Sequence, residues 1–134
     1  MTDYFEPKDN PRVIAIQKLY GYFLNKDAEI TFPKHKYKKF IKDIVNGTIE
    51  RNELIDDLLK SKLKDDINDN KTEIILKLII KVATYEFMFL HRIPVKVVIN
   101  EYLKVSDFFI ENSQKRFLNA ILDKIAKVSR VSNK

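Results

Sequence analysis

The sequence predicts an all-α protein, a compact bundle of about six to seven helices. Apolar residues recur at helical spacing in nearly every segment of the 134-residue chain. The chain has only two glycines and four prolines, which is too few for a β-sandwich with its many tight turns. A hydrophobic share of 45% with 33% charged residues is typical of a folded domain rather than a disordered chain. We therefore expect residues 1–134 to form a single domain, with flexible ends at 1–9 and 129–134.

The first three helices follow from local signals. Asn10 can cap a helix that begins at Pro11 and reaches about residue 25, because proline is favoured at the first helical position. A short second helix is expected after Pro33. It should stop near the pair Asn46–Gly47, since glycine commonly terminates helices. Thr48 is then expected to open a third helix.

The remaining helices are longer or more strongly amphipathic. A mostly apolar helix is expected from about residue 72 to residue 91. Pro94 should lie in the first turn of the next helix, which reaches about residue 110. A last helix, capped by Asn112 or Ser113, is expected to end near residue 128.

Composition and charge exclude several classes of protein. Without cysteine the chain has no disulfide, zinc ribbon or thiol nucleophile, which suits the reducing cytoplasm. No glycine-rich loop is present to cradle a nucleotide phosphate. The apolar run 74–90 is short and carries charges, so no membrane span is expected. The sequence has no signal peptide pattern either, and we expect a cytoplasmic protein.

The net charge of +6 is concentrated in two blocks. Residues 34–47 carry five lysines and one aspartate, and residues 112–134 carry six basic residues and one aspartate. Such blocks favour anionic partners, nucleic acid among them. Twenty of the 25 basic residues are lysines, which an A/T-rich genome also favours, so total charge alone carries little weight.

Catalytic and metal-binding motifs are lacking. His35 and His91 lie in unrelated segments, and no HExxH or Glu-x-x-His pair is present. We therefore expect no metal, no cofactor and no enzymatic activity.

Two carboxylates lie on the apolar sides of their expected helices. Glu86 lies opposite the polar stripe of its helix, and Glu101 shares a side with valine and phenylalanine residues. They could be an acid/base pair, but buried carboxylates more often serve structure, held by a partner. Arg12 lies on the apolar side of the first helix, and we expect it to pair with Glu86.

The first basic block interleaves lysines with aromatic residues. The run Lys34-His-Lys-Tyr-Lys-Lys-Phe can bind phosphates and stack bases. The interpretation we favour is a solvated helix face, with Tyr37 and Phe40 buried.

The second basic block surrounds an aromatic residue on the last helix. Phe117 lies at the rim of the expected core face, flanked by Lys115 and Arg116, and Lys124 follows two turns later on the same rim. A rim aromatic beside cations can stack an unpaired base. Helical spacing alone does not distinguish this from an ordinary phenylalanine at the edge of the core.

Four blocks of sequence resemble one known family. Residues 12–20 resemble the pattern R-x-x-A-x-Q-x-L-Y, and residues 81–86 are similar to the last six positions of L-R-x-A-x-Y-E. Residues 93–101 resemble I-P-x-x-V-x-I-N-E, and residues 117–124 resemble F-V-N-x-x-L-D-K. These patterns, in this order and spacing, are those of the NusB transcription antitermination family.

The resemblance implies a non-catalytic, all-helical adaptor. In that family the protein pairs with the ribosomal protein NusE, binds single-stranded boxA RNA, and joins NusA and NusG on RNA polymerase. By position, the resemblance and the rim pattern together give these candidate RNA contacts: Arg12, Lys115, Arg116, Phe117, Asn119 and Lys124. Tyr20 matches a tyrosine on the side of the protein partner. Glu86, Asn100 and Glu101 match motif residues with structural roles.

The chain also departs from the family pattern. The family usually begins with a run of arginines, whereas residues 4–10 here are nearly neutral. The arginine of the long helix is replaced by Lys81, which cannot form a bidentate fork. An alternative function is therefore a helical protein-interaction module with little RNA binding of its own.

Overall fold

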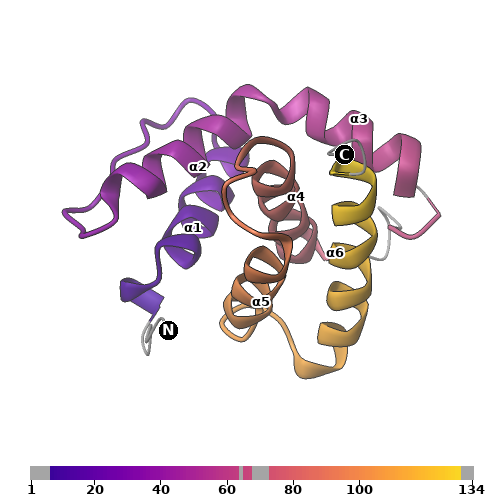
Figure 1. Ribbon diagram of the computed structural model, residues 1–134. Helices are drawn as coiled ribbons and strands as arrows, with labels where there is room; N and C mark the ends of the chain where they lie inside the picture. The colour runs from indigo at the N-terminus through magenta and orange to yellow at the C-terminus, as the bar shows by residue number, and fades with distance from the viewer. Residues whose placement is uncertain (1–6, 64, 68–72, 131–134) are drawn as a thin grey trace.

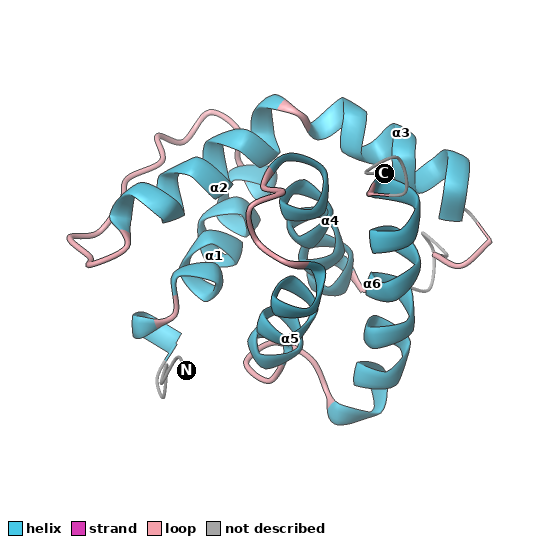
Figure 2. Ribbon diagram, viewed as in Figure 1, coloured by secondary structure: helices cyan, strands magenta, loops and turns pink. Residues whose placement is uncertain are grey.

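The computed structural model describes residues 7–63, 65–67 and 73–130. Within these residues the chain forms six α-helices, two short 3-10 helices and no β-strand, which confirms the predicted all-α bundle (Figure 2). The α-helices are α1 (Pro11–Leu24), α2 (Lys38–Glu50), α3 (Asn52–Leu63), α4 (Ile74–Phe89), α5 (Val95–Ser106) and α6 (Lys115–Ser129). The 3-10 helices are η1 (Pro7–Asp9) and η2 (Asn112–Gln114).

Helix α4 lies at the centre of the bundle. It is buried on nearly all sides between Leu76 and Phe87, as expected for a helix that is apolar all round. The other five α-helices all pack against it. In Figure 1, α2 and α3 follow each other across the top, while α6 runs along the right side. No helix in the described part of the chain is long and apolar enough to cross a membrane.

The start of α1 is as predicted. The Asn10 side chain accepts hydrogen bonds from the backbone N–H groups of Arg12 and Val13, at 3.0 and 3.3 Å, and Pro11 occupies the first helical position. This cap satisfies two of the donors that a helix N-terminus leaves free. Arg12, in the first turn of α1, faces the interior.

The predicted break at Asn46–Gly47 is wrong. Helix α2 continues through both residues to Glu50, and Thr48 is buried inside α2 rather than opening α3. Gly47 does not end the helix but allows the ring of Tyr85 to pack closely against the backbone of α2. A Cβ atom at this position would lie 2.2 Å from the hydroxyl oxygen of Tyr85, so only glycine leaves room for that ring.

Other boundaries differ from the prediction by a few residues. Helix α5 ends at Ser106 rather than near residue 110, because the next three backbone N–H groups bond to carbonyls three residues back, as in a turn. Neither Asn112 nor Ser113 caps α6. Both belong to η2, and Gln114 is the residue that precedes α6.

The C-terminal end of α6 is firmly anchored. The Arg130 guanidinium donates hydrogen bonds of 2.7–3.1 Å to the backbone carbonyls of Glu86, Phe87, Leu90 and Ile93. Within the ends that were predicted to be flexible, 1–9 and 129–134, residues 7–9 form η1 and Ser129 ends α6, and the flexibility itself stays a prediction. The rest of those predicted ends, residues 1–6 and 131–134, lies outside the described residues.

Candidate functional site

The first turns of α6 present an aromatic ring beside basic residues. Phe117 is 36% exposed, so more than a third of the side chain remains accessible to a ligand. Arg116 and Asn119 are exposed, and Lys115 is half-buried. This is the arrangement that single-stranded nucleic acids use, with bases stacked on rings and phosphates held by cations.

Helical geometry divides these residues between two sides of α6. At about 100° per residue, Phe117 and Lys124 lie on one rim of the buried face, as predicted. Lys115 and Asn119 lie on the opposite rim, one turn apart, and Arg116 points outward between the rims. A single nucleic-acid strand that crosses the start of α6 can therefore contact Phe117 and Arg116 together. Lys115 and Asn119 lie on the other side of the helix.

Ion pairs modify the charge of this surface. Lys115 pairs with Asp107, which follows α5. Lys124 pairs with Asp66 at 2.7 Å and is thereby tied to the segment after α3. Within the residues that the structure describes, Arg116 has no ion-pair partner. Arg116 is therefore the most available cation beside Phe117.

Arg12 lies inside the bundle rather than on this surface. Its guanidinium donates two hydrogen bonds of 2.8 Å to Glu86, and a nitrogen lies 3.7 Å from a Glu101 oxygen. The rings of Phe40 and Tyr102 lie 5.0 and 5.5 Å from it. Arg12 is only 6% exposed, so it is not accessible to a phosphate in this conformation. The structure therefore shows the predicted pairing of Arg12 with Glu86.

The buried carboxylates have partners suited to a structural role. Glu86 is fully buried and accepts hydrogen bonds from Arg12 and from the Tyr102 hydroxyl. Burial alone lowers the pKa of Arg12, but the hydrogen bonds and negative charge of Glu86 raise it above its ordinary value. Burial, followed by the charge of Glu86, raises the pKa of Tyr102. Asn100 is different, because it is exposed on α5 and lies outside this cluster.

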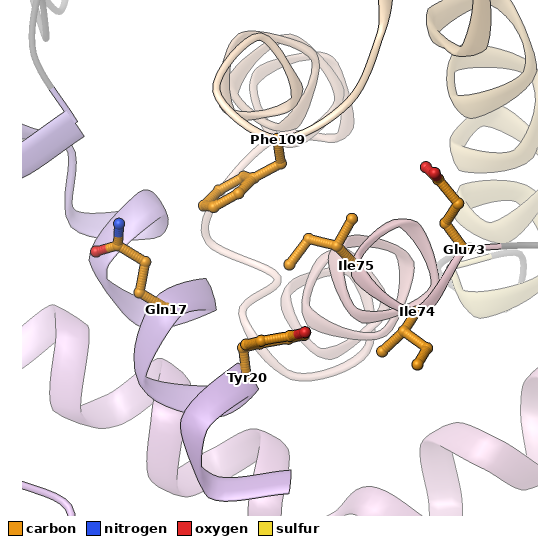
Figure 3. A pocket seen from close by; sticks show the side chains of 6 residues that line it. All are labelled: Gln17, Tyr20, Glu73, Ile74, Ile75 and Phe109. Atoms are coloured by element: carbon orange, nitrogen blue, oxygen red, sulfur yellow. The ribbon is translucent and has the colours of Figure 1, made fainter. Parts of the chain in front are cut away.

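Tyr20 lies in the wall of an open groove of about 570 Å³. The groove is lined by Gln17 and Tyr20 of α1, by Glu73, Ile74 and Ile75 at the start of α4, and by Phe109 beyond α5. Figure 3 shows Tyr20, Ile75 and Phe109 pointing toward the same space, with Gln17 and Glu73 at its edges. Such an apolar surface with a polar rim is typical of protein interfaces.

The resemblance singles out Tyr20, but nothing in the sequence analysis indicates the other residues of this groove. Ile74 is 67% exposed, although its helix is the most apolar of the chain. One sequence signal could have indicated Ile74. It is an apolar residue in the first turn of a helix, and other apolar residues of that helix already fill the side that faces the core. Phe109 could not be found in this way, because the sequence predicted it to be inside a helix.

Metal ligands do not gather in the described part of the chain. Among these residues, no group of three or more histidine, aspartate or glutamate side chains could hold a metal ion. The surfaces that stand out are the start of α6 and the groove beside Tyr20.

Comparisons with known proteins agree with these features. The model of the NusB family matches residues 9–127. The transcription antitermination protein NusB of Buchnera aphidicola subsp. Cinara cedri is 33% identical over 125 residues, covering 85% of this chain and 86% of that protein. The protein of the same name from Haemophilus ducreyi is 30% identical over 129 residues, covering 90% and 93%.

Some relatives are longer than this chain. The match to the NusB protein of Sinorhizobium fredii, 30% identical over 91 residues, covers 68% of this chain and 57% of that relative. A solved structure of T. maritima NusB has a TM-score of 0.74 and 26% identity, and covers 91% of this chain and 92% of that one. With a family match over most of its length and the same helical fold, the chain belongs to the NusB family.

Proposed function

We propose that this protein is a transcription antitermination factor that binds boxA-type single-stranded RNA together with the ribosomal protein NusE. It acts as a non-catalytic adaptor in the cytoplasm. Its complex with RNA and NusE joins NusA, NusG and RNA polymerase during ribosomal RNA transcription. The proposal combines membership of the NusB family with two surfaces of the structure.

The observation that carries the RNA part is the exposed ring of Phe117 beside Arg116. A base that stacks on this ring brings its phosphates close to the guanidinium. Arginine suits this role because its planar fork binds a phosphate through two N–H donors. Lys115 and Asn119 add a cation and a hydrogen-bonding amide on the other side of α6, whereas Lys124 is a weaker candidate because it already pairs with Asp66.

The groove beside Tyr20 is the proposed site for NusE. The turn after α5 links this groove to the Lys115 side of the proposed RNA surface. In that turn, Asp107 pairs with Lys115 of α6, and Phe109 lines the groove. Two neighbouring contacts of moderate strength reinforce each other when their ligands are themselves linked. This arrangement favours joint rather than separate binding of RNA and NusE.

The burial of Arg12 favours a second candidate function. An arginine that the resemblance assigns to RNA is instead held by Glu86, which leaves fewer cations for phosphates. On this alternative the protein is an interaction module that binds a protein partner through the groove and RNA only weakly.

A fluorescence anisotropy titration distinguishes the two functions. The RNA is a labelled boxA-type strand, with a scrambled strand of the same composition as the control, each titrated with and without NusE. We expect tighter binding of the boxA strand, strengthened by NusE and weakened steeply by salt. Equal and weak binding of both strands in the presence of NusE would favour the interaction module.

A further inference from the structure

A second basic surface lies at the start of α2. Between residues 34 and 43 the chain carries five lysines against the single acidic residue Asp43. Three of the lysines, Lys38, Lys39 and Lys42, line a hollow of about 380 Å³ with Asp43 and Asn46. Lys39 lies 3.5 Å from Asp43, so its charge is partly balanced. Lys38 and Lys42 are exposed, one turn apart, and carry the excess positive charge of the hollow.

The loop before α2 is held in a defined position. The backbone N–H of Tyr37 donates to Nδ1 of His35 at 2.9 Å. Nε2 of His35 therefore carries the proton and donates to the carbonyl of Lys8 in η1, at 3.2 Å. This histidine links the lysine-rich loop to the segment before α1. Both segments lie at one edge of the bundle, at the left in Figure 1.

An aromatic ring is part of the same surface. Tyr37 was expected to be buried, but it is 36% exposed, and the ammonium of Lys36 lies 5.5 Å from its ring centroid. The favoured interpretation of a solvated face with both aromatic residues buried is therefore wrong for Tyr37. Exposed rings among cations are typical of surfaces that bind single-stranded nucleic acid, whereas an acidic peptide needs only the charge.

We propose that residues 34–42 form a second RNA-binding surface, which holds phosphates of the same RNA strand independently of base sequence. The inference rests on the proposed function for the identity of the ligand. Lys38 and Lys42 hold the phosphates. Because the start of α6 lies on the other side of the view in Figure 1, a strand that occupies both surfaces must extend beyond the segment that contacts Phe117.

The test compares two double variants that remove the same charge. Lys38→Gln with Lys42→Gln removes the two exposed lysines of the hollow, and Lys60→Gln with Lys62→Gln removes two exposed lysines of α3. Neither change should unfold the protein, and a cation at the first turn of α2 does not stabilise that helix. Thermal melts check this point.

Each variant is titrated with two RNAs, a short boxA-type strand and the same strand extended at both ends by unrelated nucleotides. We expect the α2 variant to lose the extra affinity of the extended strand. The slope of the logarithm of its association constant against the logarithm of salt concentration is negative, and this slope should become shallower by about 0.7 for each phosphate contact removed. The α3 variant should resemble the unmodified protein. Equal binding of the extended strand by both variants would overturn the inference and leave the proposed function intact.

Two further outcomes separate the inference from the proposed function. If the unmodified protein binds boxA and scrambled strands equally, yet the α2 variant loses affinity for both, the second surface is supported and the boxA function fails. A poly-glutamate peptide serves as the other probe. If the α2 variant loses binding of this peptide but keeps full RNA affinity, the surface binds acidic protein and the inference is overturned.

Discussion

Arg12 and Glu86 form a bidentate ion pair inside the bundle, with two nitrogen–oxygen distances of 2.8 Å across 74 positions of sequence. The pair joins α1 to the central helix α4. Tyr102 of α5 donates to the same carboxylate, so three helices meet at one buried charge. The position of α1 on the bundle therefore depends on this contact as well as on apolar packing.

Arg12→Ala should destabilise the protein by about 3–5 kcal/mol, because it leaves the fully buried carboxylate of Glu86 without its cation. Urea denaturation measures this change in the free energy of unfolding. Arg116→Ala, on the exposed face of α6, should change it by less than about 0.5 kcal/mol. Unchanged stability of Arg12→Ala together with a loss of RNA binding would contradict the structural role.

Tyr102 should make the protein less stable at high pH. Its pKa is raised in the native state by burial and by Glu86, whereas an unfolded tyrosine loses its proton near pH 10. The unfolded state therefore binds fewer protons above about pH 10, and the free energy of unfolding falls as pH rises. Tyr102→Phe should be less stable at neutral pH, since Glu86 loses a hydrogen bond, and should show a shallower decline above pH 10. Urea titrations at several pH values compare the two proteins. Parallel curves above pH 10 would exclude this contribution.

The two glycines should respond in opposite directions to alanine. Gly21 lies in the last turn of α1, and a Cβ atom added there would have no atom within 4 Å, so Gly21→Ala should stabilise the protein by up to about 1 kcal/mol. Gly47→Ala places a methyl group against the buried ring of Tyr85, and overpacking of this kind costs about 1–3 kcal/mol. Thermal unfolding of both variants checks the signs. A stabilised Gly47→Ala protein would mean that the ring moves away freely.

Phe117→Ala should weaken RNA binding by about 1–3 kcal/mol if a base stacks on the ring. Phe117→Leu, which keeps an apolar side chain of similar size, should lose about as much affinity, whereas Phe117→Tyr should retain it. Anisotropy titrations with the boxA-type strand measure all three variants. Leu54→Ala, a truncation of an exposed apolar residue on α3, is the control. Full affinity of the leucine variant would show that stacking is not the contact.

Ile74→Glu should abolish NusE binding through the groove. Ile74 is exposed, so the change should alter stability by less than about 0.5 kcal/mol while it places a charge in an apolar interface. Isothermal titration calorimetry with NusE measures the loss. Leu54→Glu makes the same kind of change on α3 and should bind normally. Equal affinities of the two variants would place the partner elsewhere.

Local signals predicted the fold well. The Asn10 cap and Pro11 gave the start of α1, and the all-round apolarity of residues 74–90 gave the buried central helix. Helical spacing also gave the pairing of Arg12 with Glu86, because both residues lie on the apolar sides of their helices and need a charged partner.

Contacts between distant segments explain most of what the sequence did not predict. Gly47 has the local signature of a helix end, but its place in α2 depends on the ring of Tyr85, 38 positions later. For Arg12, helical spacing predicted the apolar side of α1 while the resemblance assigned a contact with RNA, and only the packing of α1 against α4 shows that the side chain is buried. The groove beside Tyr20 combines residues from three segments, and no periodicity in one helix reveals such a surface.

The hydrogen bonds of Arg130 have a consequence for biosynthesis. The carbonyls that this side chain binds belong to the end of α4 and the turn before α5, which are translated about forty positions earlier. Domains generally acquire structure as the ribosome releases them. The junction of α4 and α5 therefore gains these hydrogen bonds only after the end of α6 has been synthesised and has packed against it.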